Sequence, residues 1–247
     1  LYYREDVLKE LGIPVPKTYE EVVAASEKIR ASGKMQHPYA AAYKAGWNLA
    51  EEFVNMYIGH GGEFFKSGSA QPNINNAKGV ATLNMLKKLA SLSNPDYLTH
   101  DSEAIKVEWE SGKVALMTLW ASRSGTLLDD EGDAKITAAT KLTGPATVGG
   151  GNIPAATLWW DGFTLAKNRS DSDAEATFIA LAHAASNKKM VADAADQAVW
   201  LVEGFVPGPK SIGVIEAVKM GAKPYPMLPQ MGLMHGALGS EIVEFLQ

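Results

Sequence analysis

The chain has 247 residues, a formal net charge of -5 and no cysteine; 46% of its residues are hydrophobic and 21% are charged. This is the composition of a folded globular protein, and the lack of cysteine excludes disulfides, thiolate nucleophiles and thiolate metal sites. Because the basic residues are scattered rather than gathered into a stripe, we expect no nucleic-acid partner.

No apolar run in the sequence approaches the roughly 20 residues that a membrane-spanning helix requires. The sequence opens on Leu1 without a methionine, so we expect the natural N-terminus to lie upstream. The lack of a signal peptide in this chain therefore carries no information about where the protein acts.

The N-terminal region predicts a short strand and three helices. Thr18 and Glu21 have the T-x-x-E spacing of a capping box, in which side-chain and backbone groups satisfy each other where a helix starts. Glycines at positions 12 and 33 mark two helix ends. In chain order we expect a strand at 1–3, a helix at 4–11, an extended connection at 13–17, a helix from Thr18 to Gly33 and a helix at 49–58.

The middle region contains one segment that is typical of a buried strand. The run Lys113–Trp120 (KVALMTLW) is almost continuously apolar and has strand length, as expected of a strand covered on both faces. Residues 144–154 hold four glycines and two prolines and predict a loop. Around these segments we expect helices at 76–92 and 103–110, and a second, shorter strand at Lys135–Ala139.

The C-terminal region again alternates between strand and helix. We expect a strand at 158–166, helices at 171–185 and 189–199, a turn at 204–209 and a helix at 239–246. Helices that alternate with separated short strands predict an α/β fold in which helices flank a sheet. The strands are few for a chain of this length, which again indicates that an N-terminal portion lies outside it.

The motifs of common enzymes are absent from the sequence. It has no G-x-S-x-G nucleophile elbow, no G-x-x-x-x-G-K-[ST] phosphate loop and no H-E-x-x-H zinc motif. The five histidines do not pair at metal-ligand spacing. The acidic residues at 129–131, 171 and 173 fall in polar contexts, where carboxyls titrate normally and do not form a glycosidase pair. We therefore expect no catalytic residue, no metal and no cofactor.

Four of the six tryptophans lie at junctions between predicted elements, whereas Trp109 lies on the apolar side of a short helix and is expected to pack. Strand ends are where α/β folds build their ligand crevices. A flat indole suits the apolar face of a sugar ring, and neighbouring polar groups can bind its hydroxyls. The predicted ligand-binding set is Trp47, Asn48, Trp120, Arg123, Trp159, Trp160, Asp161 and Gly162.

Several segments carry a family resemblance, in the same order along the chain. They are LYYREDVLKELGIPVPKTYEEVVAASEKI, IGHGGEFF, WESGKVALMTLW, LWWDGFTLAKNRSDSDAEATFIALAHAAS, GFVPGPKS and LPQMGLMHGALGSEI. Through them the chain resembles family 1 of the extracellular solute-binding proteins, which includes maltose-binding and other oligosaccharide-binding receptors. The collinear order of the segments is more specific than any one of them.

The resemblance implies the type II fold of periplasmic binding proteins, in which two α/β lobes joined by crossing strands close around a ligand. Residues 1–160 would form the main part of the second lobe. Residues 161–205 would supply a hinge strand and helices to the first lobe, and residues 206–247 would return to the second lobe. Most of the first lobe has no counterpart in this chain.

The resemblance also assigns places to individual residues. Three tryptophans, namely Trp47, Trp120 and either Trp159 or Trp160, would line the second-lobe wall of the cleft. Asp161 and Gly162 would lie at the hinge crossing, and Arg123 and His235 near the rim. The chain departs from its relatives at His235, where they often carry a stacking aromatic residue, and at Asp161, where they commonly have glycine.

The function implied is that of the substrate-binding component of an ATP-binding-cassette importer, a monomer that captures a carbohydrate and docks on membrane permease subunits. Its expected location is the periplasm, or the cell exterior as an anchored lipoprotein, after removal of a signal peptide. Two alternatives stay open. One is a receptor for a polyamine, polyol or other non-sugar solute, with Asp161 and a tryptophan cage holding a cation. The other is a carbohydrate-processing enzyme.

Overall fold

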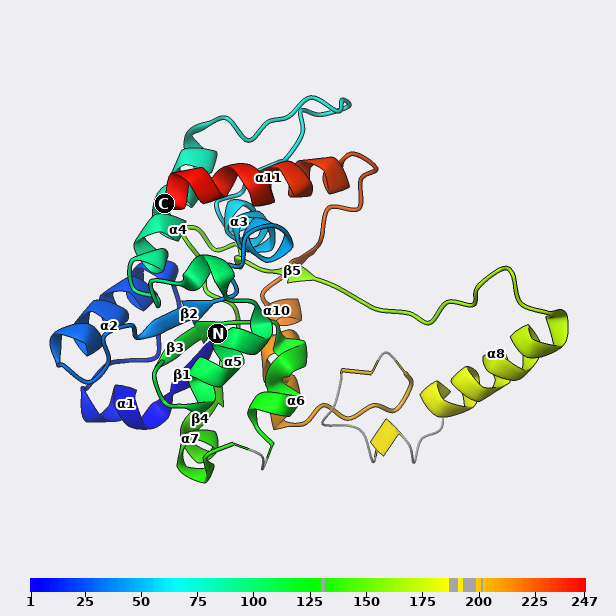
Figure 1. Ribbon diagram of the computed structural model, residues 1–247, viewed down its shortest axis with the longest axis horizontal. Helices are drawn as coiled ribbons and strands as arrows, with labels where there is room; N and C mark the ends of the chain where they lie inside the picture. The colour runs from blue at the N-terminus through cyan, green and yellow to red at the C-terminus, as the bar shows by residue number, and fades with distance from the viewer. Residues whose placement is uncertain (130–131, 187–190, 193–198, 201) are drawn as a thin grey trace.

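A four-stranded sheet forms the centre of the computed structural model, which describes residues 1–129, 132–186, 191–192, 199–200 and 202–247. The strands are β1 (Tyr2–Arg4), β2 (Tyr39–Ala41), β3 (Leu116–Thr118) and β4 (Thr140–Leu142). Their spatial order is β2-β3-β1-β4; β2 runs parallel to β3, and β1 is antiparallel to β3 and β4 (Figure 1). The α/β class expected from the sequence is confirmed.

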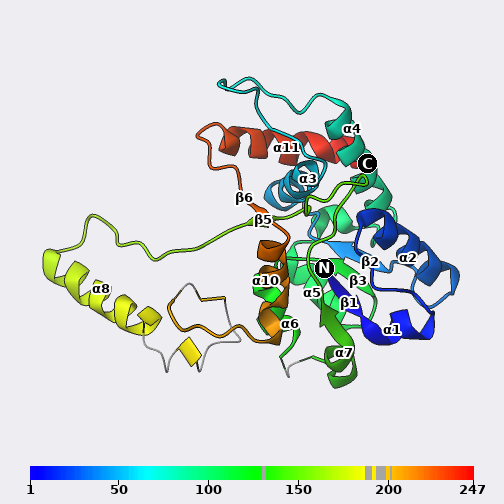
Figure 2. The ribbon, with the colours of Figure 1, turned by 180° about the vertical axis from the view of Figure 1, so that it is seen from behind.

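Both faces of the sheet are covered, because alternate strand residues enter two separate cores. Tyr39 and Leu116 belong to the larger core, whereas Ala40 and Met117 belong to the smaller one around Trp109. Trp109 is fully buried, so its predicted packing role is confirmed. The larger core joins the sheet to α2 (Tyr19–Ala31), α3 (Trp47–Gly59), α4 (Ala77–Ala90) and α11 (Met231–Leu246) (Figure 2).

Side-chain caps fix the starts of three helices, and the first of these caps is predicted from the sequence. The Thr18 hydroxyl accepts a hydrogen bond from the Glu21 backbone N–H at 3.1 Å, and Glu21 accepts from the Thr18 N–H at 3.3 Å, which completes the capping box of α2. Asn76 caps α4, and Asp101 caps α5 (Ser102–Glu110). The expected helices at 4–11, 49–58 and 171–185 correspond to α1 (Glu5–Glu10), α3 and α8 (Asp171–Ser186).

Two predicted strands are wrong in place or extent. The segment Lys135–Ala139 is helical, in α7 (Ala134–Ala139), because Asp133 accepts hydrogen bonds from the two N–H groups that open that helix; β4 follows it. The strand expected at 158–166 is limited to β5 (Thr157–Leu158), which pairs only with the two residues of β6 (Lys223–Pro224). Beyond Leu158 the described chain has no neighbouring strand to continue the ladder.

The helix expected at 239–246 is confirmed but is twice as long, since α11 begins at Met231 and has 16 residues. The helix expected at 189–199 falls largely outside the described residues. The remaining short elements are η1 (Tyr97–Thr99), η2 (Ala121–Arg123), α6 (Ser124–Leu127), η3 (Pro209–Ser211) and α10 (Ile212–Lys219). None of the described helices combines the length and the apolarity that crossing a bilayer would require.

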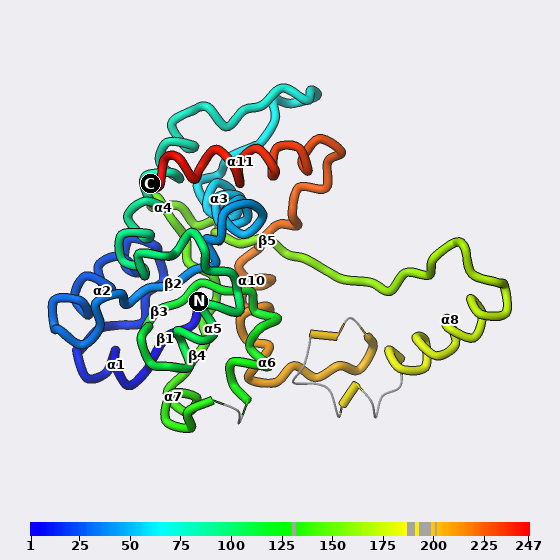
Figure 3. Tube along the Cα trace, viewed as in Figure 1, coloured from blue at the N-terminus to red at the C-terminus, as the bar shows by residue number. Residues whose placement is uncertain are grey.

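After β5 the chain leaves the body, runs out to α8 and returns at α10 (Figure 3). No residue of α8 is buried, and Phe178 and Ile179 on this helix are 63% and 59% exposed. The excursion extends away from the edge of the body where β5 and α10 lie (Figure 1), and none of its described residues belongs to either core.

Candidate functional site

The two parallel strands end at the same edge of the sheet, and each is followed by a tryptophan. After β2 the chain reaches Trp47, the first residue of α3, and after β3 it reaches Trp120, which precedes η2. The carboxyl ends of parallel strands are the usual location of ligand crevices in α/β proteins. The sheet topology therefore brings together two indoles that lie 73 positions apart in the sequence.

Hydrogen bonds from the backbone and side chains of α11 hold Trp47 in place. Gly46 has a φ of 96°, a conformation that favours glycine, and its N–H donates to the Gly239 carbonyl at 3.0 Å. His235 Nε2 lies 3.0 Å from the Trp47 carbonyl oxygen, and His235 Nδ1 lies 2.8 Å from the Tyr225 hydroxyl. Because a carbonyl only accepts, Nε2 carries the proton and the Tyr225 O–H donates to Nδ1. Burial lowers the pKa of His235, which favours this neutral form.

Trp159 comes to the same place from β5. Its indole N–H lies 2.9 Å from the Thr157 hydroxyl and 3.4 Å from a Glu51 carboxylate oxygen, and Thr157 donates to that oxygen at 2.7 Å. The Tyr225 ring packs against the Trp159 ring with a centroid separation of 4.4 Å. These contacts fix the orientation of an indole that is 48% exposed.

Trp47, Trp120 and Trp159 form what we call the indole cluster. The ring centroid of Trp47 lies 5.8 Å from that of Trp120 and 5.9 Å from that of Trp159, at interplanar angles of 64° and 60°. Trp47 stays 50% exposed although it contacts both other rings. Exposed, oriented aromatic faces of this kind provide large contact area at little cost in side-chain entropy.

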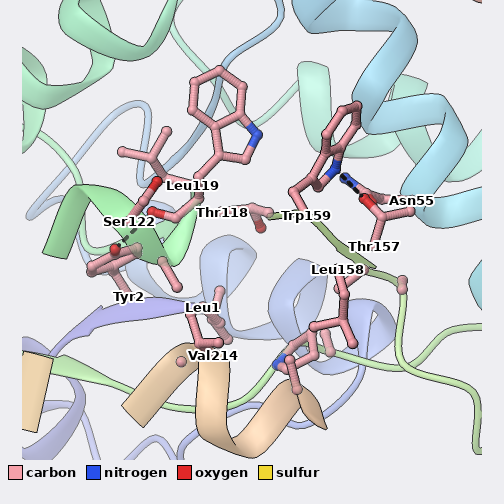
Figure 4. A pocket seen from close by; sticks show the side chains of 18 of the residues that line it. Leu1, Tyr2, Asn55, Thr118, Leu119, Ser122, Thr157, Leu158, Trp159 and Val214 are labelled. Carbon is pink, nitrogen blue, oxygen red and sulfur yellow. Dashed lines mark hydrogen bonds between the residues drawn. The ribbon is translucent and has the colours of Figure 1, made fainter. Parts of the chain in front are cut away.

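The indole cluster forms part of the wall of a cavity of about 350 Å³. Figure 4 shows Trp159, Thr157 and Asn55 on one side of this cavity and Leu1, Tyr2 and Val214 on the other. Polar groups from several elements also line the cavity, among them Tyr19, Glu52, Asn55, Thr118, Ser122 and Thr157. A pocket with aromatic walls and a few hydrogen-bonding groups suits a small ligand that is apolar on its faces and polar at its edges.

Two neighbouring carboxyls on α3 are buried next to the cavity. Glu51 is 1% exposed and Glu52 is 6% exposed, and Glu52 lines the cavity directly. Burial raises the pKa of Glu51 to about 7, and burial together with the Glu51 charge raises the pKa of Glu52 to about 8. Sequence reasoning missed both residues. Two acids inside the apolar helix sequence LAEEFVNMYI were the signal that could have found them.

These raised pKa values predict that folding stability falls as pH rises. An ordinary glutamate titrates near 4.5, so between pH 4.5 and about 7 the folded protein binds a proton at Glu51 that the unfolded chain has lost. The stabilisation is complete below pH 4.5 and disappears as pH passes 7. Its loss corresponds to about 3 kcal/mol.

Urea unfolding at pH 5 and pH 8 measures this effect. The matched variant is Glu51→Gln, because the amide keeps a hydrogen-bond acceptor for Thr157 and cannot ionise. We expect the drop in unfolding free energy between the two pH values to be smaller in the variant by about 3 kcal/mol. Equal drops in both proteins would contradict the assignment.

Of the predicted site residues, only Trp47, Trp120, Trp159 and Asp161 line the cavity. Trp160 is 59% exposed and Gly162 is also exposed, and both lie outside the lining, as does Asn48. Arg123 pairs with Glu103 at 2.8 Å. Its guanidinium lies 6.0 Å from the centre of the Trp120 ring.

The family resemblance predicts that His235 lies near the rim of the cleft, but the structure places it inside the packed body. It is 4% exposed, and its ring lies behind Trp47 at a centroid distance of 5.1 Å. The reason is that α11 begins eight residues earlier than predicted, which places His235 in a packed helix rather than in a loop. His235 can therefore act on a ligand only by positioning Trp47.

A family model described as bacterial extracellular solute-binding protein matches residues 1–198. The chain belongs to this family. The family is one of solute-binding proteins and not of enzymes, in agreement with the absence of catalytic motifs from the sequence. Among its described residues, this solute-binding protein has no group of three or more histidine, aspartate or glutamate side chains placed to hold a metal ion.

Known relatives resemble this solute-binding protein over only part of their length. A probable ABC transporter-binding protein of Deinococcus radiodurans is 30% identical over 176 residues, which are 68% of this chain and 40% of the relative. A multiple sugar-binding protein of Streptococcus mutans is 43% identical over 49 residues, which are 20% of this chain and 11% of that protein. The chain thus spans less than half the length of these two relatives.

Solved structures confirm the periplasmic-binding-protein fold. A solute-binding protein of Agrobacterium radiobacter in complex with ribitol has a TM-score of 0.78 and 22% identity, covering 99% of this chain and 63% of that one. A maltose-bound protein of T. maritima has a TM-score of 0.75 and 17% identity, covering 99% of this chain and 64% of the other. The chain therefore accounts for about two thirds of these complete binding proteins.

Proposed function

We propose that this protein is the substrate-binding component of an ATP-binding-cassette importer and that it binds a sugar or polyol between two lobes. The observation that carries the proposal is the indole cluster, since three indoles line one cavity together with hydrogen-bonding side chains. Indole faces would cover the C–H faces of the ligand, and the polar groups would bind its hydroxyls.

The lobe arrangement is part of the same proposal. Residues 1–160 and 206–247 would form one lobe, and residues 161–205 would cross to the other, in keeping with the exposed α8. A ligand would favour the closed state because only there would it touch both lobes. The closed form would dock on membrane permease subunits outside the cytoplasmic membrane.

Ligand-detected NMR with a panel of sugars, polyols and polyamines tests this proposal, because the method registers millimolar binding. We expect signals from sugars or polyols and none from putrescine or spermidine. Binding of polyamines alone would favour the alternative receptor. Binding of no compound in the panel would remove the proposed function.

The remaining alternative, a carbohydrate-processing enzyme, would need two carboxyls on opposite sides of a glycosidic bond. The carboxyls that line the cavity are Glu52, which is buried on α3, and Asp161, which is exposed beyond β5. Membership of a binding-protein family favours binding without turnover. Release of a smaller sugar from any bound oligosaccharide in the same NMR samples would contradict that conclusion.

A further inference from the structure

We propose that the cavity takes an amine-bearing sugar or polyol whose ammonium group pairs with the Glu52 carboxylate, a proposal that rests on the sugar- or polyol-binding function above. The first observation is the charge of the lining. The charged side chains that line the cavity are Glu52 and Asp161, and no lysine, arginine or histidine among the described residues joins them. The charged side chains of this wall are thus all acidic.

The second observation is that no side chain among the described residues pairs with the Glu52 carboxyl. Glu52 is 6% exposed and faces the cavity one helical turn from Asn55. No described residue forms a hydrogen bond or ion pair with its carboxyl, whereas the neighbouring Glu51 accepts from Thr157 and lies near the Trp159 N–H. A buried ionised carboxyl without a partner is costly, and an ammonium group supplies both the opposite charge and three donors. A hydroxyl supplies a donor but no charge.

The groups that surround Glu52 do not neutralise it. Tyr19 from α2, Tyr39 from β2 and Tyr43 just after β2 face it, and burial raises the pKa of each well above 10, so that they stay uncharged. The Leu1 nitrogen beside β1 donates to the Thr143 carbonyl and not to the Glu52 carboxyl.

The third observation is the indole cluster itself. Trp47 and Trp159 are half exposed and line the same cavity as Glu52. An indole face attracts a cation, and this attraction strengthens when the cation is desolvated. A ligand that places its ammonium group toward Glu52 and its ring or carbon chain against the indoles would use both walls at once.

Pairing with an ammonium group changes the protonation of Glu52, and this change can be measured as proton release and as a pH dependence of affinity. With a pKa of about 8, Glu52 holds a proton at pH 7 in the free protein. An ammonium ligand binds best to the ionised carboxylate, so the Glu52 proton passes to the buffer and the ligand keeps its own. Affinity for an amine ligand should therefore rise with pH between 6 and 8, and affinity for a neutral ligand should not.

The experiment compares matched ligands that differ only in an amine. The pairs are D-glucitol with 1-amino-1-deoxy-D-glucitol, and D-glucose with D-glucosamine, titrated calorimetrically at pH 7 in phosphate and in Tris. We expect the amine member to bind about tenfold more tightly or better, with release of about one proton. The test variant is Glu52→Gln, which keeps the side-chain shape, and Asp161→Asn is the control for the other acid.

In Glu52→Gln we expect the amine preference and the proton release to disappear, so that the two members of each pair bind about equally, and an unchanged circular dichroism spectrum and melting transition show that the variant is folded. In Asp161→Asn the amine preference and the proton release should persist. Neutral members binding as tightly as amines in the unaltered protein, or a preference that survives Glu52→Gln, would overturn the proposal and leave the sugar- or polyol-binding function standing. Binding of none of the four compounds would overturn this inference, and the broader panel would then decide the proposed function.

Discussion

Replacing Trp159 with alanine is expected to weaken sugar or polyol binding by about 5- to 150-fold, which corresponds to 1–3 kcal/mol for one stacked indole. The reason is that Trp159 presents an oriented, half-exposed face to the cavity and is held there by Thr157, Glu51 and Tyr225. The affinity of the best ligand from the panel, measured by calorimetry, gives the effect directly.

The adjacent residue offers a matched control. Trp160 has the same side chain and is 59% exposed, but it does not line the cavity. We expect Trp160→Ala to change affinity by less than about threefold, because it removes no cavity wall. A larger loss at Trp160 than at Trp159 would show that the wrong indole of the pair has been assigned to the site.

The second large effect is on stability. A methyl group added at Gly239 would lie 2.3 Å from the Gly46 carbonyl oxygen and 2.8 Å from its Cα. Both are backbone atoms, so the clash can be relieved only by moving α11 away from the loop that carries Trp47. We expect Gly239→Ala to lower the free energy of unfolding by about 1–3 kcal/mol and the melting temperature by roughly 3–10 °C.

Gly236 is the control for that experiment. It lies in the same helix, and a methyl group there would meet no atom within 4 Å. We expect Gly236→Ala to stabilise the protein by about 0.5–1 kcal/mol through its better helix propensity. Differential scanning calorimetry of the two variants should therefore show shifts of opposite sign, and shifts of the same sign would contradict the packing described for α11.

Local signals in the sequence were sufficient for much of the fold. The capping box at Thr18 and Glu21 and the buried run at Lys113–Trp120 predict α2 and β3 because their causes lie within a few residues. The segment 135–139 is predicted as a strand because five residues are too few to distinguish the repeat of a strand from the repeat of a helix. The structure forms a helix there because Asp133 caps its start. The start of α11 was hidden by its glycines, which are tolerated because one of them allows close helix packing.

The site was predictable only in part. Tryptophans at element junctions identified Trp47, Trp120 and Trp159, because strand ends can be located from the sequence. Nothing local distinguishes Trp159 from Trp160, since the choice depends on which ring reaches Thr157 and Tyr225. Glu52 owes its environment in part to Tyr19 on α2, and His235 owes its environment to Trp47 on α3. These neighbours are distant in sequence, and so the roles of Glu52 and His235 follow only from the folded chain.

The support of Trp47 by α11 has a consequence for the interpretation of variants. No residue of α11 lines the cavity, yet Gly239 and His235 hold the backbone on which Trp47 is carried. A substitution in α11 that removes either contact would therefore release one wall of the cavity while every lining residue stays unchanged.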